Sequence, residues 1–248
     1  MPRISPLKVR VFGACRLRYR YQYLDKARSR LRPGDTAGSL VHRVLCDFFS
    51  KVPAEERSRE RLLEMFEDGW EALSIRYRRM PGADQLRRAG RQQLENFAEI
   101  FDLRARPFLV EPYFQVEIEP DIVLFGRVDR IDEEPGGSLH IIDYKTGSHP
   151  DEVEAGQLTF YAIMVEDKLG RPVTRLSFWY LDDGQVWTTE LTDDEKRQAR
   201  AELLAAVQEM QTVTEFPPTI GPHCGHCPYY HTCEFRDEID RRREAEGW

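Results

Sequence analysis

The chain has 248 residues, of which 41% are hydrophobic and 32% are charged, and its formal net charge is -7. This length and composition are typical of a soluble globular protein, and we expect a single domain. No apolar run approaches the roughly 18 residues of a membrane span, and the arginine-rich start lacks the apolar core of a signal peptide, so we expect a cytoplasmic protein with no membrane partner.

The first 50 residues are basic although the whole chain is acidic. They contain eleven Lys or Arg against three Asp or Glu, a local balance of +8. Arg16, Arg18 and Arg20 alternate with tyrosines, a pattern that could bind DNA phosphates while the rings stack on bases. An ordinary exposed helix face would explain the same pattern equally well. Ser5, followed by proline, marks the start of one or two short helices.

Longer helical patterns follow this basic segment. Residues 37–49 carry apolar side chains at helical spacing and predict a helix with one buried stripe. His42 borders the stripe, where a structural histidine is the commonest explanation, and Cys46 would pack near the core as a free thiol. Further helical patterns over 54–78 and 83–104 predict an insert beside a sheet.

A predicted β-hairpin carries the most informative polar residues. Residues 126–147 read GRVDRIDEEPGGSLHIIDYKTG, in which apolar strands flank a Pro-Gly-Gly turn. The first strand is expected to run over residues 122–131. Asp129 and Asp143 each lie seven positions from Gly136, so a symmetric hairpin would set their Cβ atoms about 5 Å apart. Two carboxylates so placed suit a shared Mg²⁺, which takes oxygen ligands at about 2.1 Å.

Lys145 lies on the same strand face as Asp143, whereas Tyr144 points to the opposite side. A cation between carboxylates, with an ammonium group alongside, can support attack of metal-bound water on a phosphodiester. Taken alone, an Asp-x-Lys strand is more often one solvated face of a half-buried sheet. The remaining motifs therefore decide between these interpretations.

Elements on either side of the hairpin complete the predicted sheet. A strand over 113–118 leads into the hairpin, and a helix over 151–169 follows it. Gln157 and Tyr161 are four positions apart, so they share one face of that helix.

Two further strands, 173–181 and 185–191, are joined by an Asp-Asp-Gly turn. Thr192 and Glu195 then form a capping box for a helix that runs to about residue 212. This order of elements predicts an α/β fold with a central mixed β-sheet flanked by helices.

Four short motifs occur in the order known from one enzyme family. They are GSLVH at 38–42, GRVD at 126–129, DYK at 143–145, and Gln157 with Tyr161. Together they resemble the motifs of RecB-family nucleases within the PD-(D/E)XK superfamily. The resemblance implies a restriction-endonuclease-like core. Its expected regions are basic helices at 1–50, a helical insert at 51–110, a nuclease core at 111–191, and a C-terminal helix with a cysteine-cluster region at 192–248.

The resemblance also assigns roles to the motif residues. The implied ligands of Mg²⁺ or Mn²⁺ are His42, Asp129, Asp143 and the main-chain carbonyl of Tyr144. Lys145 would orient or activate the attacking water and steady the phosphate. Gln157 and Tyr161 would position the DNA strand or brace the site.

Cysteines near the end of the chain add a second motif. Cys224, Cys227 and Cys233 form C-x2-C-x5-C, and one earlier cysteine, Cys15, could complete a set of four. Four thiolates suit a [4Fe-4S] cluster, whereas structural Zn²⁺ suits the same set equally well. A mixed zinc site could also use one of three nearby histidines: His223, His226 and His231. The pattern resembles the iron-sulfur variant found in AddB-type helicase-nucleases and CRISPR adaptation nucleases, which favours the cluster.

The function implied by this resemblance is a metal-dependent DNA exonuclease that acts on single-stranded DNA or duplex ends. Its setting would be repair, recombination or CRISPR adaptation. The chain has no P-loop, so we expect a stand-alone nuclease that could work with a partner helicase or CRISPR integrase. The alternative is a non-catalytic DNA-end-binding or scaffolding module for such a partner. The intact set of His42, Asp129, Asp143 and Lys145 favours catalysis.

Overall fold

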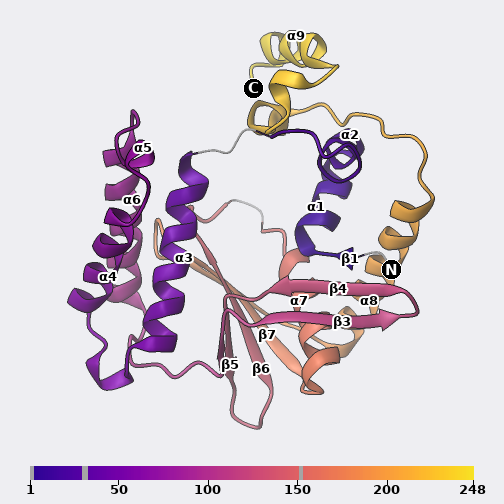
Figure 1. Cartoon of the computed structure of the whole chain (residues 1–248). Coiled ribbons are helices and arrows are strands. Elements are labelled where there is room, and N and C mark those ends of the chain that lie inside the picture. Colours follow the sequence, from indigo (N-terminus) through magenta and orange to yellow (C-terminus); the bar gives the residue numbers. More distant parts are fainter. Residues whose placement is uncertain (1–2, 30–32, 151–152) are drawn as a thin grey trace. The chain divides into compact units, whose positions relative to one another are not determined.

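The computed structural model describes residues 3–29, 33–150 and 153–248 (Figure 1). The chain divides into two compact units. The larger comprises Met1–Arg3 and Pro33–Arg200, and the smaller comprises Ile4–Arg32 and Ala201–Trp248. Among the described residues, no helix is both long enough and apolar enough to cross a lipid bilayer.

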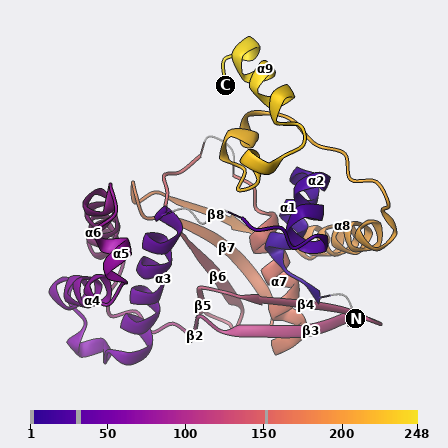
Figure 2. The same cartoon turned by 45° about the horizontal axis from the view of Figure 1, so that its top comes forward.

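A five-stranded sheet forms the centre of the larger unit (Figure 2). Its strands, in spatial order, are β2 (Leu109–Val110), β5 (Arg130–Glu133), β6 (Leu139–Lys145), β7 (Val173–Tyr180) and β8 (Val186–Glu190). The β6–β7 pair is parallel and the other pairs are antiparallel. The predicted central mixed sheet is therefore confirmed.

The crossover between the two parallel strands is helix α7 (Gly156–Leu169), which packs on the sheet and has half of its residues buried. A parallel pair needs such a crossover, and a helix is its usual form. The sequence predicted a helix over 151–169. The helix begins instead at Gly156, and positions 151 and 152 lie outside the described residues.

The hairpin of β3 (Tyr113–Glu119) and β4 (Ile122–Arg127) belongs to a second sheet and lies between β2 and β5 in the chain. The prediction of one continuous strand over residues 122–131 is wrong, because the chain leaves the β3–β4 ladder after Arg127. The N–H of Val128 donates to the carbonyl of Pro112, and the carbonyl of Asp129 accepts the N–H of Glu111. Asp129 consequently lies in the bend between two strands that belong to different sheets.

Helix α3 (Pro33–Lys51) packs against the predicted insert, whose α-helices are α4 (Arg59–Glu71), α5 (Ile75–Arg78) and α6 (Ala83–Ile100). Fully buried rings of Phe48, Phe66 and Phe97 fill the space between α3, α4 and α6. A Cβ at Gly90 of α6 would lie 3.0 Å from the Phe66 ring. Glycine therefore permits the close approach of α6 to α4.

The smaller unit contains α1 (Pro6–Ala14), α2 (Arg16–Tyr19), the π-helical turn Arg20–Leu24, the later part of α8 (Asp193–Thr212), and α9 (Arg236–Glu246). Its small core joins Phe12 and Tyr19 to Met210. Ser5 accepts the N–H of Lys8, which confirms the predicted helix start.

Candidate active site

Asp129 and Asp143 come together where the β5–β6 hairpin opens. The register pairs Arg130 with Ile142, so the hairpin is symmetric as predicted. Asp143 belongs to β6, whereas Asp129 immediately precedes β5. The backbone N–H of Tyr144 donates to Asp129 Oδ2 at 2.8 Å, which holds the first carboxylate beside the strand that carries the second.

Asp143 is a buried carboxyl, only 4% exposed, that contacts two polar side chains. Lys145 Nζ lies 2.6 Å from its Oδ2, and Gln157 Nε2 donates to its Oδ1 at 2.8 Å. Burial raises the pKa of Asp143 to about 6, and the charge of Asp129 adds to this rise while Lys145 opposes it. Two carboxylates with little access to water attract positive charge strongly. Their hard oxygen donors therefore fit a divalent cation such as Mg²⁺.

Gln157 links the two charged ends of the Asp-x-Lys motif. Its Oε1 accepts a hydrogen bond from Lys145 Nζ at 2.9 Å, while its Nε2 donates to Asp143. The same Nε2 lies 3.3 Å from the Tyr161 hydroxyl, so the two α7 residues share a face as predicted. Lys145 Nζ also lies 4.5 Å from the centre of the Phe178 ring. These contacts hold the ammonium group in one orientation.

Helix α3 brings His42 to the carboxylates. Its Nδ1 lies 3.3 Å from Asp129 Oδ1. Burial acts to lower the pKa of His42, but the hydrogen bond and charge of Asp129 outweigh it, so the pKa is raised above its usual value. One turn earlier, a Cβ at Gly38 would lie 2.9 Å from Thr146 Oγ1. The glycine thus lets α3 approach the end of β6 closely enough to deliver His42.

Glu111 belongs to none of the sequence motifs, yet it lies beside this group. Glu111 has φ of 46°, a left-handed conformation that is uncommon outside glycine. Its N–H donates to the carbonyl of Asp129 at 2.9 Å, and its negative charge helps to raise the pKa of His42. Arg127 Nη1 lies 3.4 Å from its carboxylate. The one hint in the sequence is an acidic residue two positions before the strand that leads into the hairpin.

The opposite face of β6 is aromatic. The side chain of Tyr144 points away from the carboxylates, as predicted, and packs against Phe97 and Trp179 at ring-centre distances of 5.7 and 5.9 Å. Arg130 is 3% exposed, its guanidinium lies 5.2 Å from the Trp179 ring centre, and it binds both oxygens of Asp132 at 2.7 Å. This packing supports the hairpin from behind.

The three arginines expected to bind DNA lie in the smaller unit, and two of them form ion pairs there. Arg16 pairs with Glu209 at 2.6 Å, and Arg20 pairs with Asp25 at 3.2 Å. Arg18 lines the cysteine pocket, where its Nε is buried without a hydrogen-bond partner in the described structure. DNA binding by these residues stays a prediction.

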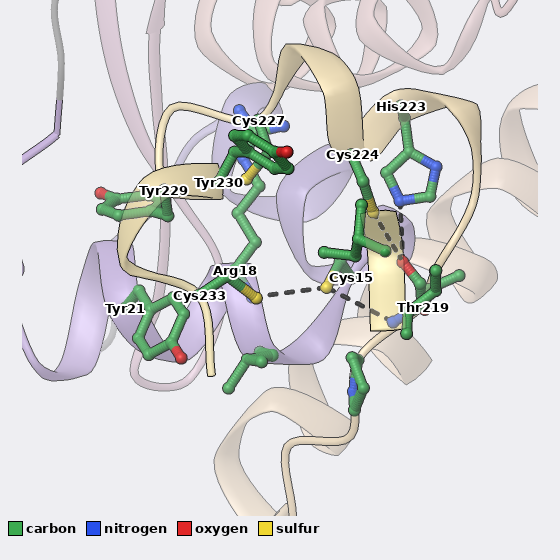
Figure 3. A pocket seen from close by; sticks show the side chains of 14 residues that line it. Cys15, Arg18, Tyr21, Thr219, His223, Cys224, Cys227, Tyr229, Tyr230 and Cys233 are labelled. Atoms are coloured by element: carbon green, nitrogen blue, oxygen red, sulfur yellow. Dashed lines mark hydrogen bonds between the residues drawn. The ribbon is translucent and has the colours of Figure 1, made fainter. Parts of the chain in front are cut away.

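The four cysteines singled out in the sequence line one pocket of the smaller unit (Figure 3). These residues are Cys15, Cys224, Cys227 and Cys233. The Cys15 thiol accepts backbone N–H groups of Arg18 and Thr219, each at 3.5 Å. Burial raises the pKa of both Cys227 and Cys233, and the other cysteines of the pocket add to the rise. Sulfur from both ends of the chain therefore meets in one place.

The other side chains near the pocket show which atoms besides the four thiols could bind a metal there. His223 lines it, and its Nε2 lies 2.9 Å from the carbonyl oxygen of Thr219. Neither His226 nor His231 lines the pocket among the described residues. Cys46 lies apart on α3, and it is a free thiol like the other four cysteines. The thiols of the pocket suit a soft metal or an iron-sulfur cluster by donor type.

Within residues 3–29, 33–150 and 153–248, no group of three or more His, Cys, Asp or Glu side chains is arranged so that it could hold a metal ion. For Asp129, Asp143 and the pocket cysteines, the case for a metal therefore rests on the chemical type of their donor atoms and on the contacts described above. The main-chain carbonyl of Tyr144 stays a predicted ligand.

The model of the PD-(D/E)XK nuclease superfamily matches residues 3–234. One similar solved structure, from Eubacterium rectale, is described as a "Putative exonuclease"; it has 11% sequence identity and a TM-score of 0.51, covering 90% of this chain and 86% of that chain. Another, SSO0001, has 16% identity and a TM-score of 0.41, covering 82% of this chain and 97% of that chain. The first likeness concerns the fold alone. No curated protein matches the chain.

Proposed function

The chain belongs to the PD-(D/E)XK nuclease superfamily, and we propose that it is a metal-dependent DNA exonuclease acting on single-stranded DNA or duplex ends. One observation carries this proposal. Asp143, Lys145 and Gln157 form a closed set of contacts beside Asp129, with the ammonium group 2.6 Å from one carboxylate oxygen and 2.9 Å from the amide oxygen. A purely structural strand has no need of such a buried charged cluster.

His42, Asp129, Asp143 and the Tyr144 carbonyl would hold Mg²⁺ or Mn²⁺. When bound, the cation would stabilise charge on the phosphate and make a coordinated water more acidic. Gln157 and Asp143 keep the Lys145 ammonium at a fixed point, where it can donate a hydrogen bond to the attacking water or to a non-bridging phosphate oxygen. Tyr161 braces Gln157 and lies where a DNA strand would pass in this proposal.

The proposal is tested by release of nucleotides from end-labelled DNA, with Mg²⁺, Mn²⁺ or EDTA, using protein purified without oxygen. Lys145→Ala and Asp143→Ala should each lower cleavage by about 100-fold or more, because the first removes an ammonium group that compensates negative charge in the transition state and the second removes a proposed ligand of the cation. Lys168→Ala is the matched control, since Lys168 is exposed in the last turn of α7. Near-normal cleavage by either site variant would contradict the assigned roles.

The alternative is a non-catalytic DNA-end-binding or scaffolding module for a helicase or integrase. It predicts DNA binding without nucleotide release under every metal condition. The repair, recombination or CRISPR setting, and a partner of either kind, remain predictions from the sequence motifs.

We also propose that the cysteine pocket holds a [4Fe-4S] cluster, with structural Zn²⁺ as the alternative. Support comes from the four free thiols that line one pocket. Free thiols are typical of a reducing compartment, which supports the expected cytoplasmic location. Brown protein with stoichiometric iron and sulfide would favour the cluster. Colourless protein with stoichiometric zinc would favour the alternative.

A further inference from the structure

The helical insert contains a concentrated run of arginines that the candidate active site does not use. Residues 75–91 include six arginines and a single acidic residue, Asp84. Three of the six are explained by packing within the insert, since they pair with carboxylates of α4. Arg78 pairs with Glu71, while Arg87 and Arg91 both pair with Glu67.

Of the other three, Arg88 lies on α6, whereas Arg76 and Arg79 belong to α5 and its C-terminal cap. Both side chains are exposed, and within the described chain neither forms a hydrogen bond or ion pair. The adjacent Ile75 is 57% exposed, which is unusual for a large apolar side chain. Two unpaired guanidinium groups and an apolar side chain therefore occupy one short, exposed segment.

This segment is held firmly in place. Ser74 Oγ accepts the N–H of Tyr77 at 3.3 Å and caps the start of α5. The Tyr77 ring lies 5.7 Å from the Trp70 ring, and burial raises the pKa of its hydroxyl. The exposed arginines thus project from a fixed element, which reduces the entropy lost when they bind a ligand.

The position of α5 connects it to the candidate active site. Tyr77 is hydrogen-bonded to the backbone of Ala37 in the first half of α3. The next residue, Gly38, is the one that packs against Thr146, directly after Lys145. Figure 1 shows α5 at this same end of α3. A chain that crosses α5 can therefore continue toward the carboxylates within the larger unit.

Arg43 extends this positive surface along α3. It directly follows His42, and its side chain is exposed. Its Nη2 lies 3.8 Å from the position that a Cβ would occupy at Gly69 of α4, so the guanidinium reaches toward the insert. No ion pair or hydrogen bond within the described residues neutralises it.

We propose that Arg43, Arg76 and Arg79 bind the phosphodiester backbone of single-stranded DNA and lead it to the candidate active site. Guanidinium groups match phosphate oxygens in a bidentate geometry. A single strand exposes its bases, so an apolar side chain such as Ile75 can contact them, whereas a duplex keeps them stacked inside. A positive path is also needed because the site itself holds two carboxylates that repel phosphate. This inference rests on the proposed nuclease function.

The test measures binding of a fluorescein-labelled oligothymidine by anisotropy, in EDTA, at several salt concentrations. Arg76→Gln with Arg79→Gln should raise Kd by about tenfold. Each lost phosphate contact should also reduce the steepness of log K against log salt by about 0.7. Arg88→Gln is the matched control, because Arg88 is exposed and unpaired on α6 in the described structure. It should change Kd by less than about twofold.

Unchanged affinity and salt slope in the double variant would overturn the proposal, as would failure of the wild-type protein to bind the oligonucleotide. Loss of binding to duplex DNA alone would overturn the choice of a single strand. The single variants, each expected to raise Kd about threefold, replace the double variant if that protein melts early. Arginine-dependent binding without any metal-dependent cleavage would retain this binding path and refute the nuclease function, so the two failures are distinguishable.

Discussion

Two titratable groups on β6, the half-buried His140 and the buried Asp143, should make stability depend on pH in opposite directions. His140 is the first, and its Nε2 lies 2.7 Å from Ser177 Oγ. Burial lowers the pKa of His140 to about 4 from its usual 6.5. Below about pH 6.5 His140 is protonated in the unfolded chain, whereas in the folded chain it stays neutral down to about pH 4. Acidification through this window should therefore cost up to about 3 kcal/mol of stability.

Protonation of Asp143 should change the stability of the fold in the opposite direction. Burial raises the pKa of Asp143 to about 6 from 3.8, so the folded state takes up a proton first as the pH falls. The folded state then gains up to about 3 kcal/mol between about pH 6 and pH 4 relative to its value at neutral pH. In the metal-free protein the two effects should nearly cancel.

Single variants should reveal each effect. His140→Gln should be up to about 3 kcal/mol more stable than the wild type at pH 4.5 when both are compared with their values at pH 7. Asp143→Asn should be less stable by a similar amount on the same scale. The measurement is urea unfolding in EDTA across this range. If the curve of His140→Gln parallels that of the wild type, His140 is not held neutral, and the same outcome for Asp143→Asn would refute its raised pKa.

Three more predictions concern separate parts of the chain. Gln157→Leu should lower metal-dependent cleavage by about 100-fold because it releases Lys145, whereas Gln93→Leu on α6 should lower only the melting temperature. Thr192→Ala removes the confirmed capping box and should cost about 1 kcal/mol in urea unfolding. Cys15→Ala should lose metal and melt earlier, while Cys46→Ala should keep its metal, as measured by iron, sulfide and zinc analysis.

The parts of the site that could be predicted depend on short-range geometry. The hairpin register follows from a period of two and a central glycine turn, and it brings Asp129 opposite Asp143. The contact between Gln157 and Tyr161 follows from helical spacing. His42 could be located on its helix, but its distance to Asp129 could be anticipated only through the family resemblance.

The parts that could not be predicted depend on contacts between distant segments. The single strand expected over 122–131 splits because the Glu111 and Pro112 backbone pairs with the bend around Asp129. Hydrophobic alternation continues through that bend, so the pattern gives no sign of it. The pairing of Arg16 with Glu209 joins residues far apart in the chain, and local charge balance cannot reveal such a partner.

One strand joins the chemistry of this site to the packing behind it. The backbone N–H of Tyr144 holds Asp129, and its side chain is fixed between Phe97 and Trp179. The aromatic face therefore determines where the carboxylate of Asp129 stands relative to Asp143. Effective phosphoryl chemistry requires the reacting groups to be placed within fractions of an ångström. A cavity made behind β6 should therefore lower the rate of DNA cleavage although no charged residue is changed. The aromatic residues behind the strand are thus positioning residues as well as core.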